Sequence, residues 1–194
     1  MKPLVLLGTV TGIALFAGIR LYATVLTVGL CLRYGLLHLP PELASLSVLA
    51  HTHVLVAAGI CTVMEFLVDK VPWVDSLWDA VHAFLRPAGA ALIAFAAVGQ
   101  LDPAVEVAVV LLCGGVAFSS HSAKAGTRLL VNQSPEPFSN LVLSLFEDVV
   151  VVVGSYAAVA HPLAILAVVA VFLVLFVLLG RRIYRRLRRD PALP

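Results

Sequence analysis

Apolar residues occur in long runs separated by short polar stretches, which is typical of a chain that crosses a lipid bilayer several times. A helix needs about 20 mainly apolar residues to span the hydrocarbon core, and fewer where it is broken or re-entrant. We predict an all-α, polytopic transmembrane helix bundle of six or seven spans, some short or broken. The lower count applies if residues 4–37 form one tilted, interrupted helix. The seven candidate segments are Pro3–Phe16, Leu21–Leu37, Val48–Val68, Pro87–Val98, Ala104–Phe118, Leu141–Ala160 and Leu163–Leu179.

The composition excludes a water-soluble globule. Of the 194 residues, 61% are hydrophobic and 12% are charged, whereas soluble domains have roughly 45–50% apolar and about 25% charged residues. Residues 1–180 contain seven Lys or Arg and ten Asp or Glu. The body is therefore slightly acidic and offers no basic face for a nucleic acid.

Six arginines lie between positions 181 and 189, directly after the last apolar run. A basic run at this place is the usual cytoplasmic anchor of a final transmembrane helix, and it suits contact with anionic membrane lipids. We predict one transmembrane domain over residues 1–185 and a basic cytoplasmic tail over 181–194. Seven spans would place Arg20 and the stretches 69–86 and 124–137 on the cytoplasmic side as well, whereas six would move the N-terminus inside.

A short internal repeat is visible. The pattern A-G-x-R-L occurs at residues 17–21 and 125–129, about 108 positions apart, each time between two apolar runs. Transporter folds are often built from repeated halves, here 1–85 and 86–185, whose interface holds the substrate. The alternative is that glycine lets helices approach and that arginine caps a helix end.

The first polar cluster lies between the third and fourth apolar runs and contains Glu65, Asp69, Lys70, Asp75 and Asp79. Glu65 and Asp69 are four residues apart, as are Asp75 and Asp79, so each pair would share one helical face. A solvated amphipathic loop is the alternative. It explains Glu65 poorly, because an ionisable group inside an apolar run needs a partner or contact with water.

The second polar cluster contains Lys124, Arg128 and Asn132, followed by Pro137 and then by Asn140, Ser144, Glu147 and Asp148 at helical spacing. A helix that begins near Pro137 would present free N–H groups beside the two bases, which is an arrangement that binds anions. A plain cytoplasmic loop with a capped helix is the alternative. The stripe that follows should face protein or water, since it enters an apolar span.

Acids and bases of the two clusters nearly balance, so we expect them to pair. Such a network can simply lock the helices together, or it can form a gated path for an ion or a proton. The candidate residues for binding a substrate or ion are Arg20, Glu65, Asp69, Lys70, Asp75, Asp79, Arg86, Lys124, Arg128, Asn132, Asn140, Ser144, Glu147 and Asp148.

Other chemistries have little support in the sequence. His51 and His53 point in different directions on a helix, and no third ligand is obvious, so no metal site is predicted. Gly-rich phosphate loops, HExxH and GxSxG are missing, so no cofactor is predicted and an enzyme is not favoured. The three cysteines lie singly in apolar runs and do not indicate a disulfide framework.

Three stretches resemble a known family. They are E-x3-D-K-x-P-x-V-D-S from Glu65, R-P-x-G-A from Arg86, and K-A-G-x-R from Lys124 continuing through S-P-E-P-x-S-N to S-x-x-E-D. Together they are similar to domain-of-unknown-function family 4126, small integral membrane proteins of bacteria with relatives in plastids. The resemblance covers roughly residues 5–185, although Leu21 stands where the family typically has proline. It implies a location in the inner membrane of a bacterium and a shared site formed by the polar clusters, and it implies no activity.

We therefore consider three functions. The leading hypothesis is a small transporter or channel-like permease, in which Arg20, Lys124, Arg128 and the helix start after Pro137 receive an anionic group or ion. The acids would then act as counter-charges or as proton or cation carriers. The second is a lipid flippase or a protein that handles phospholipid head groups. The third is a scaffold subunit without a substrate of its own. A homo-oligomer is compatible with all three.

Overall fold

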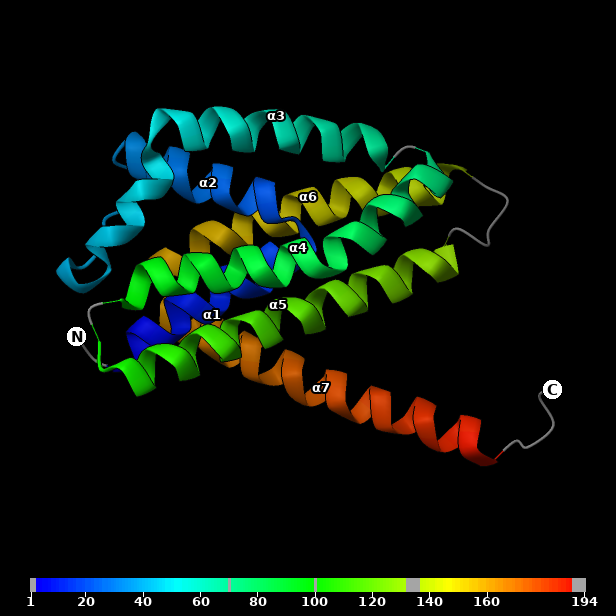
Figure 1. Cartoon of the computed structure of the whole chain (residues 1–194). Coiled ribbons are helices and arrows are strands. Elements are labelled where there is room, and N and C mark those ends of the chain that lie inside the picture. The colour runs from blue at the N-terminus through cyan, green and yellow to red at the C-terminus, as the bar shows by residue number, and fades with distance from the viewer. Residues whose placement is uncertain (1–2, 70, 100, 132–136, 190–194) are drawn as a thin grey trace.

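A computed structural model describes residues 3–69, 71–99, 101–131 and 137–189. These residues form helices only, which confirms the all-α class (Figure 1). In chain order the elements are α1 (Pro3–Ile19), α2 (Leu21–Arg33), the 3₁₀ helix η1 (Pro41–Ala50), α3 (Thr52–Val68), α4 (Pro72–Val98), α5 (Pro103–Val131), α6 (Pro137–Ala160) and α7 (Pro162–Arg189).

The number of spans differs from the expected six or seven, which the structure does not confirm. Among the described residues, the four helices α4 to α7 are long and apolar enough to cross a membrane. A fifth span results if η1 and α3, which meet at an angle of 61°, cross as one broken helix. The chain therefore has the character of a multi-pass membrane protein with fewer crossings than hydropathy indicated.

Helices α1 and α2 explain most of this difference. At about 1.5 Å per residue, 17 and 13 residues reach roughly 25 and 20 Å, short of the 30 Å hydrocarbon core. The chain breaks at Arg20, whose backbone is extended at φ −146° and ψ 97°. Beyond the break, α2 returns toward the end of the bundle where α1 begins (Figure 1). The two segments that we predicted as spans, or as one tilted helix, are thus two short helices that run in opposite directions, with Arg20 at the turn between them.

Helix α1 is the centre of the bundle and packs against α4, α5, α6 and α7. Every residue from Gly8 to Gly18 is buried. Small residues permit this close packing: a Cβ at Gly12 would come within 2.9 Å of the Ala158 Cβ, and one at Gly18 within 2.8 Å of the Ala117 Cα. Removing a side chain at such positions lets helix backbones approach, as is common in membrane bundles.

The two polar stretches are largely helical, as their spacing predicted, and the alternative of solvated loops does not hold for them. Residues 72–86 form the first half of α4, and residues 124–131 complete α5. Hydropathy began the α4 segment too late and ended the α5 segment too early, because it reads buried charges as solvent-exposed ones. Pro87 lies inside α4 rather than at the start of a span. The C-terminal ends of α3, α5 and α7 and the N-terminal ends of α4 and α6 lie at one end of the bundle (Figure 1).

Candidate functional site

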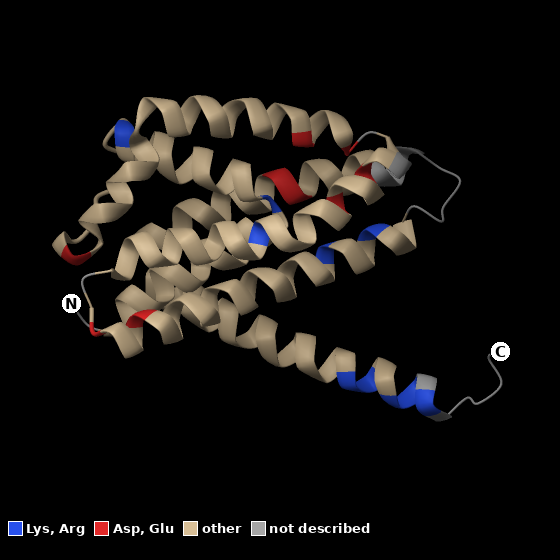
Figure 2. Ribbon diagram, viewed as in Figure 1, with Lys and Arg blue, Asp and Glu red and all other residues tan. Residues whose placement is uncertain are grey.

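The structure brings eleven of the fourteen candidate residues together in one buried cluster. They come from α3 to α6 and from the break between α1 and α2, and they gather in one half of the bundle (Figure 2). Lys70 and Asn132 lie outside the described residues, and so does the side chain of Asn140, whose backbone belongs to α6. The cluster comprises Arg20, Glu65, Asp69, Asp75, Asp79, Arg86, Lys124, Arg128, Ser144, Glu147 and Asp148.

Arg20 enters the cluster from the break between α1 and α2, and its side chain is 1% exposed. Its Nη2 donates to Asp69 Oδ2 and, at 3.0 Å, to Ser144 Oγ. Its Nε lies 3.0 Å from Asp148 Oδ1, and Nη2 lies 3.6 Å from Glu147 Oε2. One guanidinium therefore joins the end of α3 to the first half of α6.

Arg128, on α5, binds two of the acids that Arg20 approaches, Asp69 and Glu147. Its Nη2 and Nε donate to the two oxygens of Glu147 at 2.8 and 3.3 Å, a forked arrangement that suits the planar guanidinium. Nη2 also donates to Asp69 at 3.2 Å, and Nη1 donates to Asp75 at 3.5 Å. Arg128 thus connects acids from α3, α4 and α6.

Arg86 is the centre of a second group of paired side chains within the cluster. Its Nη2 donates to Glu65 Oε1 at 2.5 Å, and its Nη1 donates to Asp79 Oδ1 at 3.1 Å. Nη1 also donates to His121 Nδ1 at 2.6 Å. An imidazole nitrogen that accepts this bond carries no proton, so His121 is neutral. The pairing supplies the partner that Glu65 required in an apolar run.

Sequence reasoning missed the histidines. His121 precedes Lys124 by one helical turn and therefore shares its face, a signal that was present in the pattern. His82 stacks on Trp78 at a centroid distance of 4.4 Å, and its Nδ1 lies 2.8 Å from the Trp78 carbonyl oxygen. Its Nε2 forms a hydrogen bond with the Tyr22 hydroxyl at 3.1 Å. No pattern in the sequence links Tyr22 to His82, because they lie 60 positions apart.

The described side chains of the cluster carry more acids than bases. Burial would raise the pKa of Asp69, but Lys124, Arg20 and Arg128 outweigh burial and lower it, which favours the ionised form of Asp69. The six acids are Glu65, Asp69, Asp75, Asp79, Glu147 and Asp148, and the four bases are Arg20, Arg86, Lys124 and Arg128.

Two cavities reach the cluster from either side of α5. One, of about 240 Å³, lies between α4 and α5 and is lined by Asp75, Asp79, His121 and Arg128 together with small residues. The other, of about 410 Å³, lies among α1, α5, α6 and α7. Its walls are mostly apolar, with Lys124 and Glu147 as charged lining residues. The charged groups are thus buried in the protein and still border space for a small ion.

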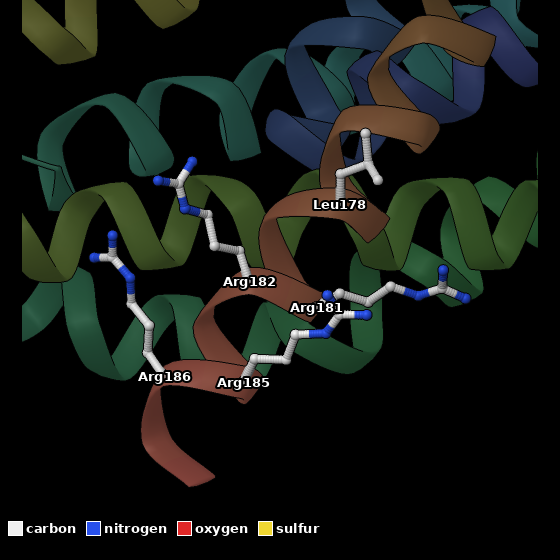
Figure 3. A pocket seen from close by; sticks show the side chains of 5 residues that line it. All are labelled: Leu178, Arg181, Arg182, Arg185 and Arg186. Carbon is white, nitrogen blue, oxygen red and sulfur yellow. The ribbon is translucent and has the colours of Figure 1, made fainter. Parts of the chain in front are cut away.

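The arginine tail is a separate basic feature. Figure 3 shows Arg181, Arg182, Arg185 and Arg186 on successive turns of α7, around a hollow that Leu178 also lines. All four arginines are exposed. They meet none of the acids of the cluster among the ion pairs of the described residues. This surface suits the head groups of anionic lipids, and the cytoplasmic placement of the tail stays a prediction.

Within the described residues, no group of three or more His, Cys, Asp or Glu side chains could hold a metal ion. Long apolar helices around buried ion pairs define the class: a multi-pass helical membrane protein with a buried charge network. The chain belongs to the family described as Domain of unknown function (DUF4126), whose model matches residues 7–182. This confirms the resemblance and brings no activity with it. No curated protein and no solved structure matches the chain.

Proposed function

We propose that this protein is a transporter or channel-like permease for a small ion, and that the ion crosses at the charge cluster. We place it in the bacterial inner membrane with its C-terminus in the cytoplasm. The observation that carries the proposal is one cluster of six acids and four bases inside an apolar helix bundle, in which every member except Asp148 is buried. Ionisable groups inside membrane proteins are costly and commonly mark ion and proton pathways.

The charge balance favours a cation or a proton over the anion that we first considered. Arg20, Arg86 and Arg128 are already engaged by carboxylates at hydrogen-bonding distance. An anion would have to displace these acids in a medium of low dielectric constant, where the interactions are strong. The excess of carboxylates over bases instead leaves room for added positive charge.

The backbone supports the same function. The turn between α1 and α2 places a non-helical residue, Arg20, inside the bundle, and irregular backbone at membrane depth is tolerated where protein or a cavity surrounds it. Pro87 lacks an N–H group, so the carbonyl of Ala83 has no α-helical partner, and Ala83 lines the cavity between α4 and α5. Broken helices and freed carbonyls are the parts from which secondary transporters build cation sites.

Flux measurements in liposomes test the proposal. Purified protein should move sodium, potassium or protons down an imposed gradient, and Arg128→Ala should abolish the movement. Asp75→Asn, which keeps the shape of the side chain and removes its charge, should lower the rate at least tenfold. Asp102→Asn is the matched control, because Asp102 is exposed and caps Ala104 at the opposite end of α5. Absence of flux across a panel of cations, protons and small anions would refute the proposal.

One observation favours a second function, the handling of lipid. The cavity among α1, α5, α6 and α7 joins apolar walls to a lysine and a glutamate, which suits an amphiphile with a charged head group. Lipid scrambling in the same liposomes, without ion flux, would support this function. A stable partner that co-purifies, with neither activity present, would instead support the scaffold hypothesis.

A further inference from the structure

Lys124 differs from the other bases of the cluster in how loosely it is held. Its Nζ lies 3.7 Å from Glu147 Oε2 and 3.9 Å from Asp79 Oδ1, beyond hydrogen-bonding distance of both. Its Nζ donates a hydrogen bond to the carbonyl oxygen of Ile19 at 3.3 Å. The side chain is nevertheless 2% exposed. A buried ammonium that is paired this loosely gains little to offset its lost hydration.

Lys124 is also the base that can give up its charge. Arginine stays protonated in proteins, whereas a buried lysine readily becomes neutral. The nearby His121 is already committed as a neutral group, because its Nδ1 accepts a bond from Arg86. Among the described side chains, the charged groups that interact with Lys124 are Glu65 on α3, Asp69 at the end of α3, Asp75, Asp79 and Arg86 on α4, and Glu147 on α6.

Lys124 stands between the two cavities. Asp79 lines the cavity between α4 and α5, whereas Lys124 and Glu147 line the cavity among α1, α5, α6 and α7. The ammonium lies within 4 Å of one acid from each. Its charge therefore acts on both cavities at once, and a cation entering either one meets its repulsion.

We propose that Lys124 exchanges its proton for a monovalent inorganic cation, so that the permease works as a proton–cation exchanger. This inference rests on the proposed function. When the cation binds beside Asp79 or Glu147, the Lys124 ammonium releases one proton and becomes a neutral amine. The net charge of the cluster is unchanged by the exchange: one positive charge enters and one leaves. When the cation leaves the cluster through one cavity, the amine takes up a proton from that same cavity.

The experiment uses full-length protein in liposomes that enclose a pH-sensitive dye, with sodium or potassium gradients imposed across the membrane. The wild type should move protons opposite to the cation. Lys124→Arg keeps a permanent charge, so we expect proton movement to fall at least tenfold. Lys124→Gln provides no proton, so we expect cation flux without proton movement. Ser122→Ala is the matched control, because Ser122 lies on the same helix, lines neither of the two cavities and bonds its own helix at Phe118.

A second measurement does not depend on the variants folding. Adding sodium or potassium to wild-type protein in unbuffered detergent solution should release about one proton per bound cation.

Negative results would distinguish the two proposals. If the wild type moves no ion, the proposed function itself fails. If the wild type carries cations but Lys124→Arg exchanges protons at the same rate, or no proton is released on binding, the permease stands and the role of Lys124 is refuted.

Discussion

Arg20 and Arg128 lie more than a hundred positions apart, yet their Nη2 atoms donate to the same oxygen, Oδ2 of Asp69. Both also approach Oε2 of Glu147, at 3.6 and 2.8 Å. The two arginines belong to the two copies of the A-G-x-R-L pattern. One lies in a helix break and the other inside α5, so the copies differ in local structure and share the acids that they bind.

Their glycines give the first prediction. A Cβ at Gly18 would lie 2.8 Å from the Cα of Ala117 and closer still to the Ala117 carbonyl, whereas a Cβ at Gly126 meets nothing within 4 Å. Overpacking typically costs about 1–3 kcal/mol. Gly18→Ala should therefore lower the Tm in detergent, and Gly126→Ala should leave it unchanged or raise it slightly, because alanine favours a helix. Equal effects of the two substitutions would contradict the packing that we describe.

Asp69 gives the second prediction, because it holds two buried arginines. Asp69→Asn leaves those charges undercompensated, and breaking a buried pair costs about 3–5 kcal/mol. Thermal unfolding followed by circular dichroism measures the loss. Asp148→Asn is the control, since the Asp148 side chain is 29% exposed, and it should cost less than a third as much.

The same residue sets a dependence on pH. Burial would raise the pKa of Asp69, but Lys124, Arg20 and Arg128 lower it below its ordinary value of about 3.9. A lowered pKa in the folded state adds stability that is complete above about pH 4 and is lost as the pH falls through the lower folded value. The wild type should therefore lose stability below pH 4 more steeply than Asp69→Asn. Parallel curves for the two proteins would show that Asp69 is not held as an ion.

Arg86 gives a prediction about geometry rather than charge. Its guanidinium binds Glu65, Asp79 and His121 at once, at 2.5, 3.1 and 2.6 Å. An ammonium cannot reproduce this planar fork, so Arg86→Lys should destabilise the protein although the charge is kept. Arg33→Lys should have no measurable effect, because exposed Arg33 makes its bond to Thr52 through a single nitrogen. A Tm equal to that of the wild type for Arg86→Lys would argue against the fork.

The sequence predicted those features of the fold and site that depend on local pattern. Long apolar runs specified α5, α6 and α7, and helical spacing placed Ser144 and Glu147 on a buried stripe. The isolated charge of Glu65 correctly predicted a partner. Hydropathy measures the length of a run and not its direction, so it could not show that α2 turns back at Arg20. Pairings such as Arg86 with His121 depend on how helices dock, and no spacing in one chain encodes them.

The two cavities give the last prediction, which also tests whether the charge network conducts ions or only holds the helices together. Ala125 lines the cavity between α4 and α5, and Ala123 lines the cavity on the other side of α5. In protein that keeps Cys113 but lacks the other two cysteines, a small water-soluble thiol reagent should label Ala123→Cys and Ala125→Cys. Cys113 on the same helix is fully buried among apolar side chains and should stay unmodified, which makes it an internal control. Bound cation should slow labelling at position 125, because it would occupy the cavity beside Asp79. Labelling at neither position in folded protein would mean that water does not reach the network, which would then hold the helices together without conducting.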